Sequence, residues 1–226
     1  MISFTEIYDR FINLVDDPQL NRAYVENPIQ FKKVAYNFLI NGLSNFTSPP
    51  QVSDLLAEQE NPDGSLEIFD GNGTNEYQLD MAIPDGADVM LFIANKPDKD
   101  GYVKDGKAYF SRSVPKGVKC AVEWYSAGAF TADLDKTAGG MKTAALYKRV
   151  IEILARCMVI GWADKEQNFM LDIRNLLNDT DFKLHSPANS LKSKMDWVNS
   201  LRFEIYTLQT KLDWDLRNIT ISYYNY

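Results

Sequence analysis

The side chains that most enzymes use for acid–base chemistry and metal binding are scarce in this sequence. Its 226 residues include one histidine, His185, which directly precedes the predicted start of a helix. No Ser-His-Asp or Cys-His arrangement can be built without this residue, and a histidine-rich metal site is excluded. We interpret His185 as a surface or helix-capping residue.

The two cysteines, Cys120 and Cys157, are far apart in the sequence, and each lies within an apolar pattern. Free cysteine is among the most buried residue types. We therefore predict two core thiols rather than a disulfide or a metal-binding pair.

Acidic residues offer two further candidate sites. Asp98 and Asp100 resemble part of a calcium loop, but the next acidic residue and the distal glutamate are missing at the required spacing. This favours a polar hairpin loop, with a weak ion site as the alternative. Four other carboxylates would make an acid–base pair only in a pocket, whereas charges beside an amphipathic helix usually face solvent. They are Asp133, Asp135, Glu152 and Asp164. We expect no enzyme, no bound metal and no cofactor.

Composition indicates an ordinary globular chain. It is 45% hydrophobic and 24% charged, which suffices for one sizeable core or two smaller ones. A net charge of −7 disfavours binding to the nucleic-acid backbone. The chain starts without the regions of a signal peptide, and no apolar run reaches the about 18 residues of a membrane span. We expect a soluble protein made in a reducing cytoplasm, with no membrane contact.

Two helix starts are marked near the N-terminus. Ser3 and Glu6 form a capping box, and the apolar residues that follow share one face, which predicts a helix over 4–15. Asn27 followed by Pro28 is a second start signal and predicts a helix over 28–45.

Turn signals alternate with short β-prone runs between about residues 50 and 130. Residues 89–93 are continuously apolar, whereas residues 118–124 alternate between apolar and polar, as a half-buried strand does. A central Asp-Gly pair within 102–110 predicts a hairpin with a tight turn. These patterns predict a separate β module.

The C-terminal part carries two long helical patterns. Apolar residues recur at helical spacing from about Thr143, and a following segment over 166–180 has the same spacing. Ser186 as the N-cap and Pro187 at the first helical position mark the start of another long helix. Its apolar residues repeat with a period of about 3.5 residues as far as about Asn218.

Together these elements predict an α+β fold, with a mainly helical body, long C-terminal helices and an inserted small antiparallel β-sandwich or barrel. The predicted body comprises residues 1–49 and 130–218, and the β domain comprises residues 50–129, with joins near Pro50 and Ala129. Residues 219–226 are β-branched and aromatic without a turn signal, so we expect an extended tail.

Aromatic side chains are the remaining signal, with twelve Tyr, twelve Phe and four Trp. Large aromatics outside a core mark protein interfaces, although most of them can also simply fill the two cores. The candidates on or beside the last helix are Trp197, Tyr206 and Trp214. The candidates in the tail, for contact with a neighbouring subunit or another partner, are Ile219, Ile221, Tyr223, Tyr224 and Tyr226.

Four stretches of the chain carry a family resemblance. They are VEWYSAGAFTADL at 122–134, IEILARCMVIGW at 151–162, NDTDFK at 178–183 and SPANSL at 186–191. With the long last helix, they resemble the neck proteins of tailed bacteriophages, which are head-to-tail connector or adaptor proteins. The resemblance covers residues 118–226, and the N-terminal helices only in general character.

The resemblance implies a non-enzymatic structural protein of the virion neck that is assembled in the cytoplasm of the bacterial host. Such a protein is expected to form a twelve-fold ring beneath the portal protein and above a tail-side stopper or tail-terminator protein. DNA would only pass through the lumen, whose acidic charge would repel it. The tail would dock to the portal or to a neighbouring subunit.

Two other functions compete with this one. The first is a tail-completion or portal-associated auxiliary virion protein. The second is a carbohydrate- or receptor-binding module built on the β insertion, suggested by Tyr102, Tyr109, Trp124 and Tyr125. Exposure of these four aromatics on one sheet face would favour the binding module, and burial would count against it.

Overall fold

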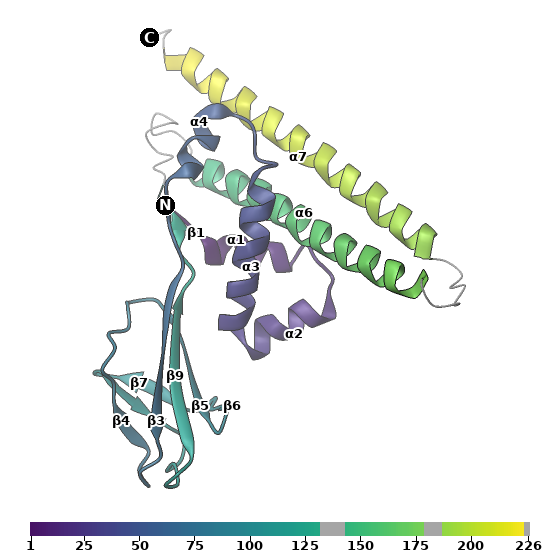
Figure 1. Cartoon of the computed structure of the whole chain (residues 1–226). Coiled ribbons are helices and arrows are strands. Elements are labelled where there is room, and N and C mark those ends of the chain that lie inside the picture. The colour runs from purple at the N-terminus through teal and green to yellow at the C-terminus, as the bar shows by residue number, and fades with distance from the viewer. Residues whose placement is uncertain (132–142, 179–186, 224–226) are drawn as a thin grey trace. The chain divides into compact units, whose positions relative to one another are not determined.

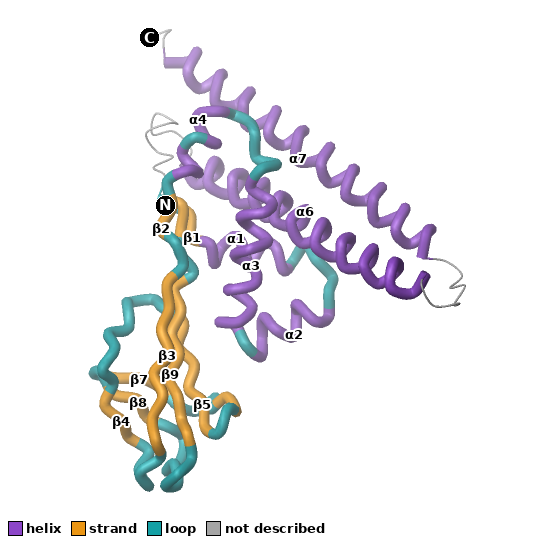
Figure 2. The backbone as a smooth tube through the Cα atoms, viewed as in Figure 1, coloured by secondary structure: helices purple, strands orange, loops and turns teal. Residues whose placement is uncertain are grey.

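The computed structural model describes residues 1–131, 143–178 and 187–223; at residues 55 and 143 and within 167–178, 187–194 and 218–223 it describes the backbone. The fold is α+β, as predicted. The chain divides into two compact units, one mainly helical and one made mainly of β-strands (Figures 1 and 2).

The helical unit consists of three segments of the chain, Met1–Asn21, Val34–Glu60 and Ala129–Tyr226. The β unit consists of Arg22–Lys33 and Asn61–Gly128. The second join therefore lies at Ala129, where a join was predicted, but the first follows Glu60 rather than Pro50.

The difference at the first join has a structural reason. Residues 50–60 form the short helix α4 (Pro50–Ser53), the 3-10 turn η1 (Leu55–Ala57) and the strand β2 (Gln59–Glu60), which all belong to the helical unit. In turn, Arg22–Lys33 belongs to the β unit, where Lys32 pairs with Asp88 at 2.6 Å.

The first helix, α1 (Phe4–Ile12), starts at the predicted cap. The backbone N–H of Thr5 donates to Ser3 Oγ at 3.2 Å, and the helix buries its apolar face. It ends earlier than the predicted residue 15, because the chain turns at Asn13, whose backbone N–H donates to the carbonyl of Phe11.

Helix α2 (Pro18–Glu26) was not predicted, whereas α3 (Pro28–Leu43) was. Both start with an Asx cap followed by proline. Asp17 Oδ1 accepts from the backbone N–H of Gln19 at 2.7 Å, and Asn27 Oδ1 accepts from that of Gln30 at 3.1 Å. Because α2 buries none of its residues, it lacks the apolar periodicity that reveals a helix in a sequence.

A three-stranded sheet of order β1-β10-β2 lies in the helical unit. Strand β1 (Ile2–Ser3) pairs with β10 (Ala129–Phe130), which also pairs with β2. Glu60 and Ala129 are register partners, so the two ends of the inserted segment 61–128 are held side by side.

Helices α6 (Thr143–Asn178) and α7 (Pro187–Tyr223) lie side by side as an antiparallel hairpin (Figure 1). α6 is one continuous helix, so the segment predicted separately over 166–180 continues the helix that starts at Thr143. α7 starts at Pro187, as predicted. The predicted cap Ser186, like His185, lies outside the described residues.

The prediction of an extended tail from Ile219 is wrong for residues 219–223, because α7 continues to Tyr223. β-branched and aromatic residues cost a helix only about 0.5 kcal/mol each relative to alanine, and extending an existing helix needs no new nucleus. No glycine or proline follows Pro187 in the sequence to end the helix. Tyr224 and Tyr226 lie outside the described residues.

Two glycines bring α3 and α6 into backbone contact. A Cβ atom added to Gly42 would lie 2.0 Å from the carbonyl oxygen of Cys157, and one added to Gly161 would lie 2.3 Å from that of Phe38. These distances leave no room for a side chain, so the helices cross at a separation that only glycine permits.

The β unit contains two antiparallel sheets, of order β3-β9-β5-β6 and β4-β8-β7. Residues from both sheets, among them Leu91, Ala108 and Val122, form one apolar core. The strands are β3 (Asp63–Asp70), β4 (Glu76–Gln78), β5 (Asp88–Ile93), β6 (Lys96–Pro97), β7 (Tyr102–Lys104), β8 (Lys107–Tyr109) and β9 (Lys119–Ser126).

Two predicted features of the β unit are confirmed. Cys120, Val122 and Trp124 are buried along β9 while Lys119 is exposed, which is the alternation of a strand with one face in the core. The turn between β7 and β8 has positive φ at both central residues, 51° at Asp105 and 71° at Gly106, as a type I′ hairpin requires.

The acidic loop at 98–101 is closed by hydrogen bonds. Asp98 Oδ2 accepts from the backbone N–H of Ser111 at 2.8 Å, so this carboxylate holds the loop beside β8.

Within the described part of the chain, no three His, Cys, Asp or Glu residues are grouped closely enough to hold a metal ion. No described helix is long and apolar enough to cross a membrane.

Candidate docking surface on the helical hairpin

Helix α7 has a buried face and an aromatic face. Val198, Ile205 and Leu212 are buried at intervals of seven residues, as the predicted 3.5-residue period requires. On another side of the helix, Phe203 and Trp214 are 71% and 67% exposed, and Tyr206 is 68% exposed. Aromatic side chains carry large apolar areas, so this face leaves much apolar surface in water.

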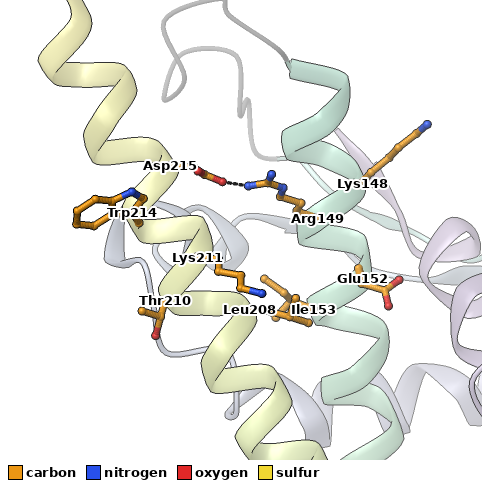
Figure 3. A pocket seen from close by; sticks show the side chains of 9 residues that line it. All are labelled: Lys148, Arg149, Glu152, Ile153, Leu208, Thr210, Lys211, Trp214 and Asp215. Atoms are coloured by element: carbon orange, nitrogen blue, oxygen red, sulfur yellow. Dashed lines mark ion pairs between the residues drawn. The ribbon is translucent and has the colours of Figure 1, made fainter.

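A groove of about 800 Å³ runs between α6 and α7 beside Trp214 (Figure 3). Ile153 from α6 and Leu208 from α7 lie between the two helices and make its apolar part. Polar side chains from both helices surround them. These are Lys148, Arg149 and Glu152 on α6, and Thr210, Lys211 and Asp215 on α7.

The carboxylates of this groove are already paired. Asp215 forms an ion pair with Arg149 across the groove, as Figure 3 shows. Glu152 binds two arginines: Arg10 donates from Nη2 to Oε1 at 3.0 Å, and Arg156 forms a second ion pair. Glu152 therefore joins α1 to α6.

The lysines of the groove are different. Among the residues whose side chains the structure describes, no carboxylate lies within ion-pair distance of Lys148 or Lys211. Both lysines are exposed. The groove therefore carries two positive charges that its described residues do not neutralise, on a chain whose net charge is −7.

Trp197, the third predicted aromatic of α7, lies at a different place. Its ring meets that of Trp162 on α6 edge-to-face, with centroids 6.2 Å apart, and it is 39% exposed. The two rings line a smaller hollow of about 230 Å³ together with Val15 and Val198. Trp197 thus contributes to packing within the hairpin, whereas Tyr206 and Trp214 face solvent.

The predicted tail residues divide between described and undescribed parts of the chain. Ile219, Ile221 and Tyr223 lie in the last turns of α7, where the structure describes the backbone. Tyr224 and Tyr226 lie beyond the described residues. The side chains of all five residues lie outside the described part of the structure, and their role in docking stays a prediction.

The candidate catalytic groups are not gathered in one place. Asp164 pairs with Arg202 at 3.6 Å, and Glu152 is held by its two arginines, while Asp133 and Asp135 lie outside the described residues.

Both cysteines are buried, as predicted. Burial raises the pKa of Cys157 to about 12, so its thiol stays protonated at neutral pH.

The aromatics of the β unit do not share one exposed face. Trp124 and Tyr125 are buried on β9. Tyr102 is exposed, and its ring is stacked on that of Tyr109 with centroids 5.0 Å apart, so each ring covers one face of the other. A sugar-binding platform needs several exposed rings side by side, and of these four residues only Tyr102 is exposed.

Two features of the docking surface were missed in the sequence. Phe203 is 71% exposed, and its position between Val198 and Ile205, off the apolar repeat, was the available signal. Lys148 and Lys211 gave no signal, because only the folded structure shows which of the charged side chains are paired.

No protein-family model, curated protein or solved structure matches the chain. The function of the surface formed by α6 and α7 is therefore inferred from its exposed side chains and its charges. Exposed aromatic rings beside an apolar groove with charged rims are typical of a surface that binds another protein.

Proposed function

We propose that this chain is a structural protein of the virion neck, a head-to-tail connector of a tailed bacteriophage. In this role it forms a ring between the portal and the tail and carries out no catalysis. The proposal starts from the resemblance of residues 118–226 to phage neck proteins. The order of strand β9, strand β10 and the long helix α6 is compatible with that resemblance, in which the last strand of a β insertion leads into a long helix.

The observation that carries the proposal is the aromatic face of α7. Phe203, Tyr206 and Trp214 are each about two-thirds exposed or more. A lone monomer gains nothing from holding three such rings in water, whereas a subunit that packs against other proteins buries them. A ring component has neighbours on both sides and partners above and below.

Charge supports the same proposal. A net charge of −7 disfavours retention of DNA, which suits a ring through which DNA passes without being held. The partners of each subunit in such a ring are further copies of this chain in a twelve-fold arrangement, the portal protein, and a stopper or tail-terminator protein.

Electron microscopy with antibody labelling tests the proposal. Antibodies raised against the purified chain, coupled to gold, are applied to virus particles produced from the genome that encodes it. We expect label at the vertex where head and tail meet, because the neck lies there. Particles of an unrelated tailed phage serve as the control and should stay unlabelled.

Other label positions would identify the competing functions. Label at the distal end of the tail or on fibres would indicate a receptor-binding protein, and label along the tail would indicate a tail protein. Either result, or a complete absence of label from particles disrupted to expose the neck, would refute the connector function. The burial of Trp124 and Tyr125 already weakens the receptor-binding alternative.

A further inference from the structure

We propose that the groove between α6 and α7 binds an acidic amphipathic helix of a partner protein, an inference that rests on the neck function for the identity of that partner. Three features carry it: the apolar part made by Ile153 and Leu208, the exposed ring of Trp214 at one rim, and the two lysines without a described carboxylate partner.

The groove selects a helical occupant because it offers no backbone partners. It is lined by side chains of two α-helices, whose backbone N–H and C=O groups are bonded within each helix. A strand or loop docked there would bury unpaired backbone groups, whereas a helix satisfies its own. A helix laid between two others is also a common packing arrangement.

The length of the groove sets the number of contacts. Its residues on α7 run from Leu208 to Asp215, which corresponds to about 10 Å, or two helical turns. A docked helix would therefore place apolar side chains at positions i, i+3 or i+4, and i+7 against Ile153, Leu208 and Trp214. This is a small site, which fits an affinity in the micromolar range rather than a permanent interface.

The charges of the groove select an acidic occupant. Glu152 and Asp215 are neutralised by arginines of the chain itself, so they need no cation from a partner. Lys148 and Lys211 have no such partner among the described side chains. Carboxylates that flank the apolar side chains of the occupant would pair with these lysines, whereas lysines at the same positions would be repelled.

Fluorescence anisotropy with labelled peptides tests this proposal on the intact purified chain. The probe is a helical peptide of about 16 residues with leucine at i, i+3 and i+7 and glutamate at the flanking positions. A second peptide keeps the leucines and carries lysine in place of every glutamate. We expect the acidic peptide to bind with a micromolar Kd and the basic peptide to bind at least about tenfold more weakly.

Variants locate the binding. The double substitution Lys148→Glu, Lys211→Glu should weaken the acidic peptide at least about tenfold and strengthen the basic one, because it reverses the charge of the rims. Trp214→Ala should weaken both peptides about tenfold by removing the aromatic contact. The matched control, Lys104→Glu with Lys116→Glu, changes two exposed lysines of the β unit and should leave the Kd of both peptides unchanged.

Several outcomes would overturn the proposal: equal affinity of the two peptides, an acidic peptide that does not bind, or an affinity that the Lys148 and Lys211 substitutions leave unchanged. Circular dichroism of each variant shows that the helices are retained. Peptide binding does not depend on virus particles. If the chain binds the acidic peptide selectively but antibodies do not find it at the neck, the neck function alone is refuted. If antibodies find it at the neck but it does not distinguish the two peptides, the proposed helix-binding groove alone is refuted.

Discussion

At the scale of single residues, the side chain of Gln209 binds several backbone groups of another segment. It lies on α7 and is 3% exposed. Its Oε1 accepts from the backbone N–H of Thr47 at 3.0 Å and of Ser48 at 2.8 Å, and its Nε2 donates to the carbonyl of Asn45 at 2.7 Å. One side-chain amide therefore satisfies three backbone groups in the segment that leads from α3 to α4.

Replacing Gln209 with leucine should lower the free energy of unfolding by about 2 kcal/mol, because three partly buried backbone groups lose their partner while the volume of the side chain is kept. Urea unfolding followed by circular dichroism measures this change. Gln78→Leu is the matched control. Gln78 is exposed, and its Nε2 donates to the carbonyls of Gly106 at 3.0 Å and Leu79 at 3.5 Å, so its loss should cost about 0.5 kcal/mol or less. Equal effects of the two substitutions would contradict the role given to Gln209.

Which side chains face solvent was only partly predictable. Trp197, Tyr206 and Trp214 were chosen because they are large aromatics on the last helix. All three are exposed, but Trp197 is the least exposed of them because its ring packs against Trp162. The spacing of apolar residues in a sequence shows which face of a helix is buried. It does not show which residue of a neighbouring helix a given side chain contacts. For this reason the contact of Trp197 was missed.

At the scale of whole elements, helices α3 and α6 cross in backbone contact at Gly42 and Gly161. Gly161→Ala would raise intrinsic helix propensity by about 1 kcal/mol, yet its new Cβ would meet the carbonyl oxygen of Phe38. We expect the clash to dominate, with a net loss of about 2 kcal/mol of stability and a lower Tm in thermal unfolding.

The propensity contribution can be measured separately in the same helix. Ala145 is exposed on α6, so Ala145→Gly reports the cost of glycine there without any change in packing. If Gly161→Ala raised the Tm by as much as Ala145→Gly lowers it, the helices would not be in backbone contact at Gly161.

Helix starts were more predictable than helix ends. The starts of α1, α3 and α7 each follow from a cap or a proline that acts within one turn. The end of α7 was wrongly placed at Asn218 because the residues that follow favour strands. Their preference is weak, and the helix already formed before them decides their conformation.

For the molecule as a whole, the β unit should be removable. Residues 61–128 start and end beside the register partners Glu60 and Ala129, so a linker of about four glycine and serine residues can replace them. We expect the shortened chain to keep a cooperative helical unfolding transition in circular dichroism. Helix α2 and the first turn of α3 should become less stable, because the ion pair between Lys32 and Asp88 is lost.

Loss of the cooperative transition would show that the helical unit needs the β unit for its own core. The full-length chain is the reference for this measurement. Compared with it, the shortened chain should show less strand signal and nearly the same helical signal.

The two-part organisation was predictable in outline, because turn-rich β segments and long helical repeats have different sequence patterns. The joins and the charge pairing were not. Glu152 pairs with Arg10 across most of the chain, and no local pattern encodes such a distance. The docking groove depends on these long-range pairs, since they determine which charges stay free for a partner.

The small sheet β1-β10-β2 also has a consequence for the order in which the chain is completed during synthesis. Ile2 pairs with Phe130, so strand β1 has no partner until the whole β unit has been made. Helix α1 waits longer, since it packs against α6, which is translated later still. Residues 2–12 are therefore synthesised well before the segments that they pack against, and their apolar side chains stay open to chaperones throughout that interval.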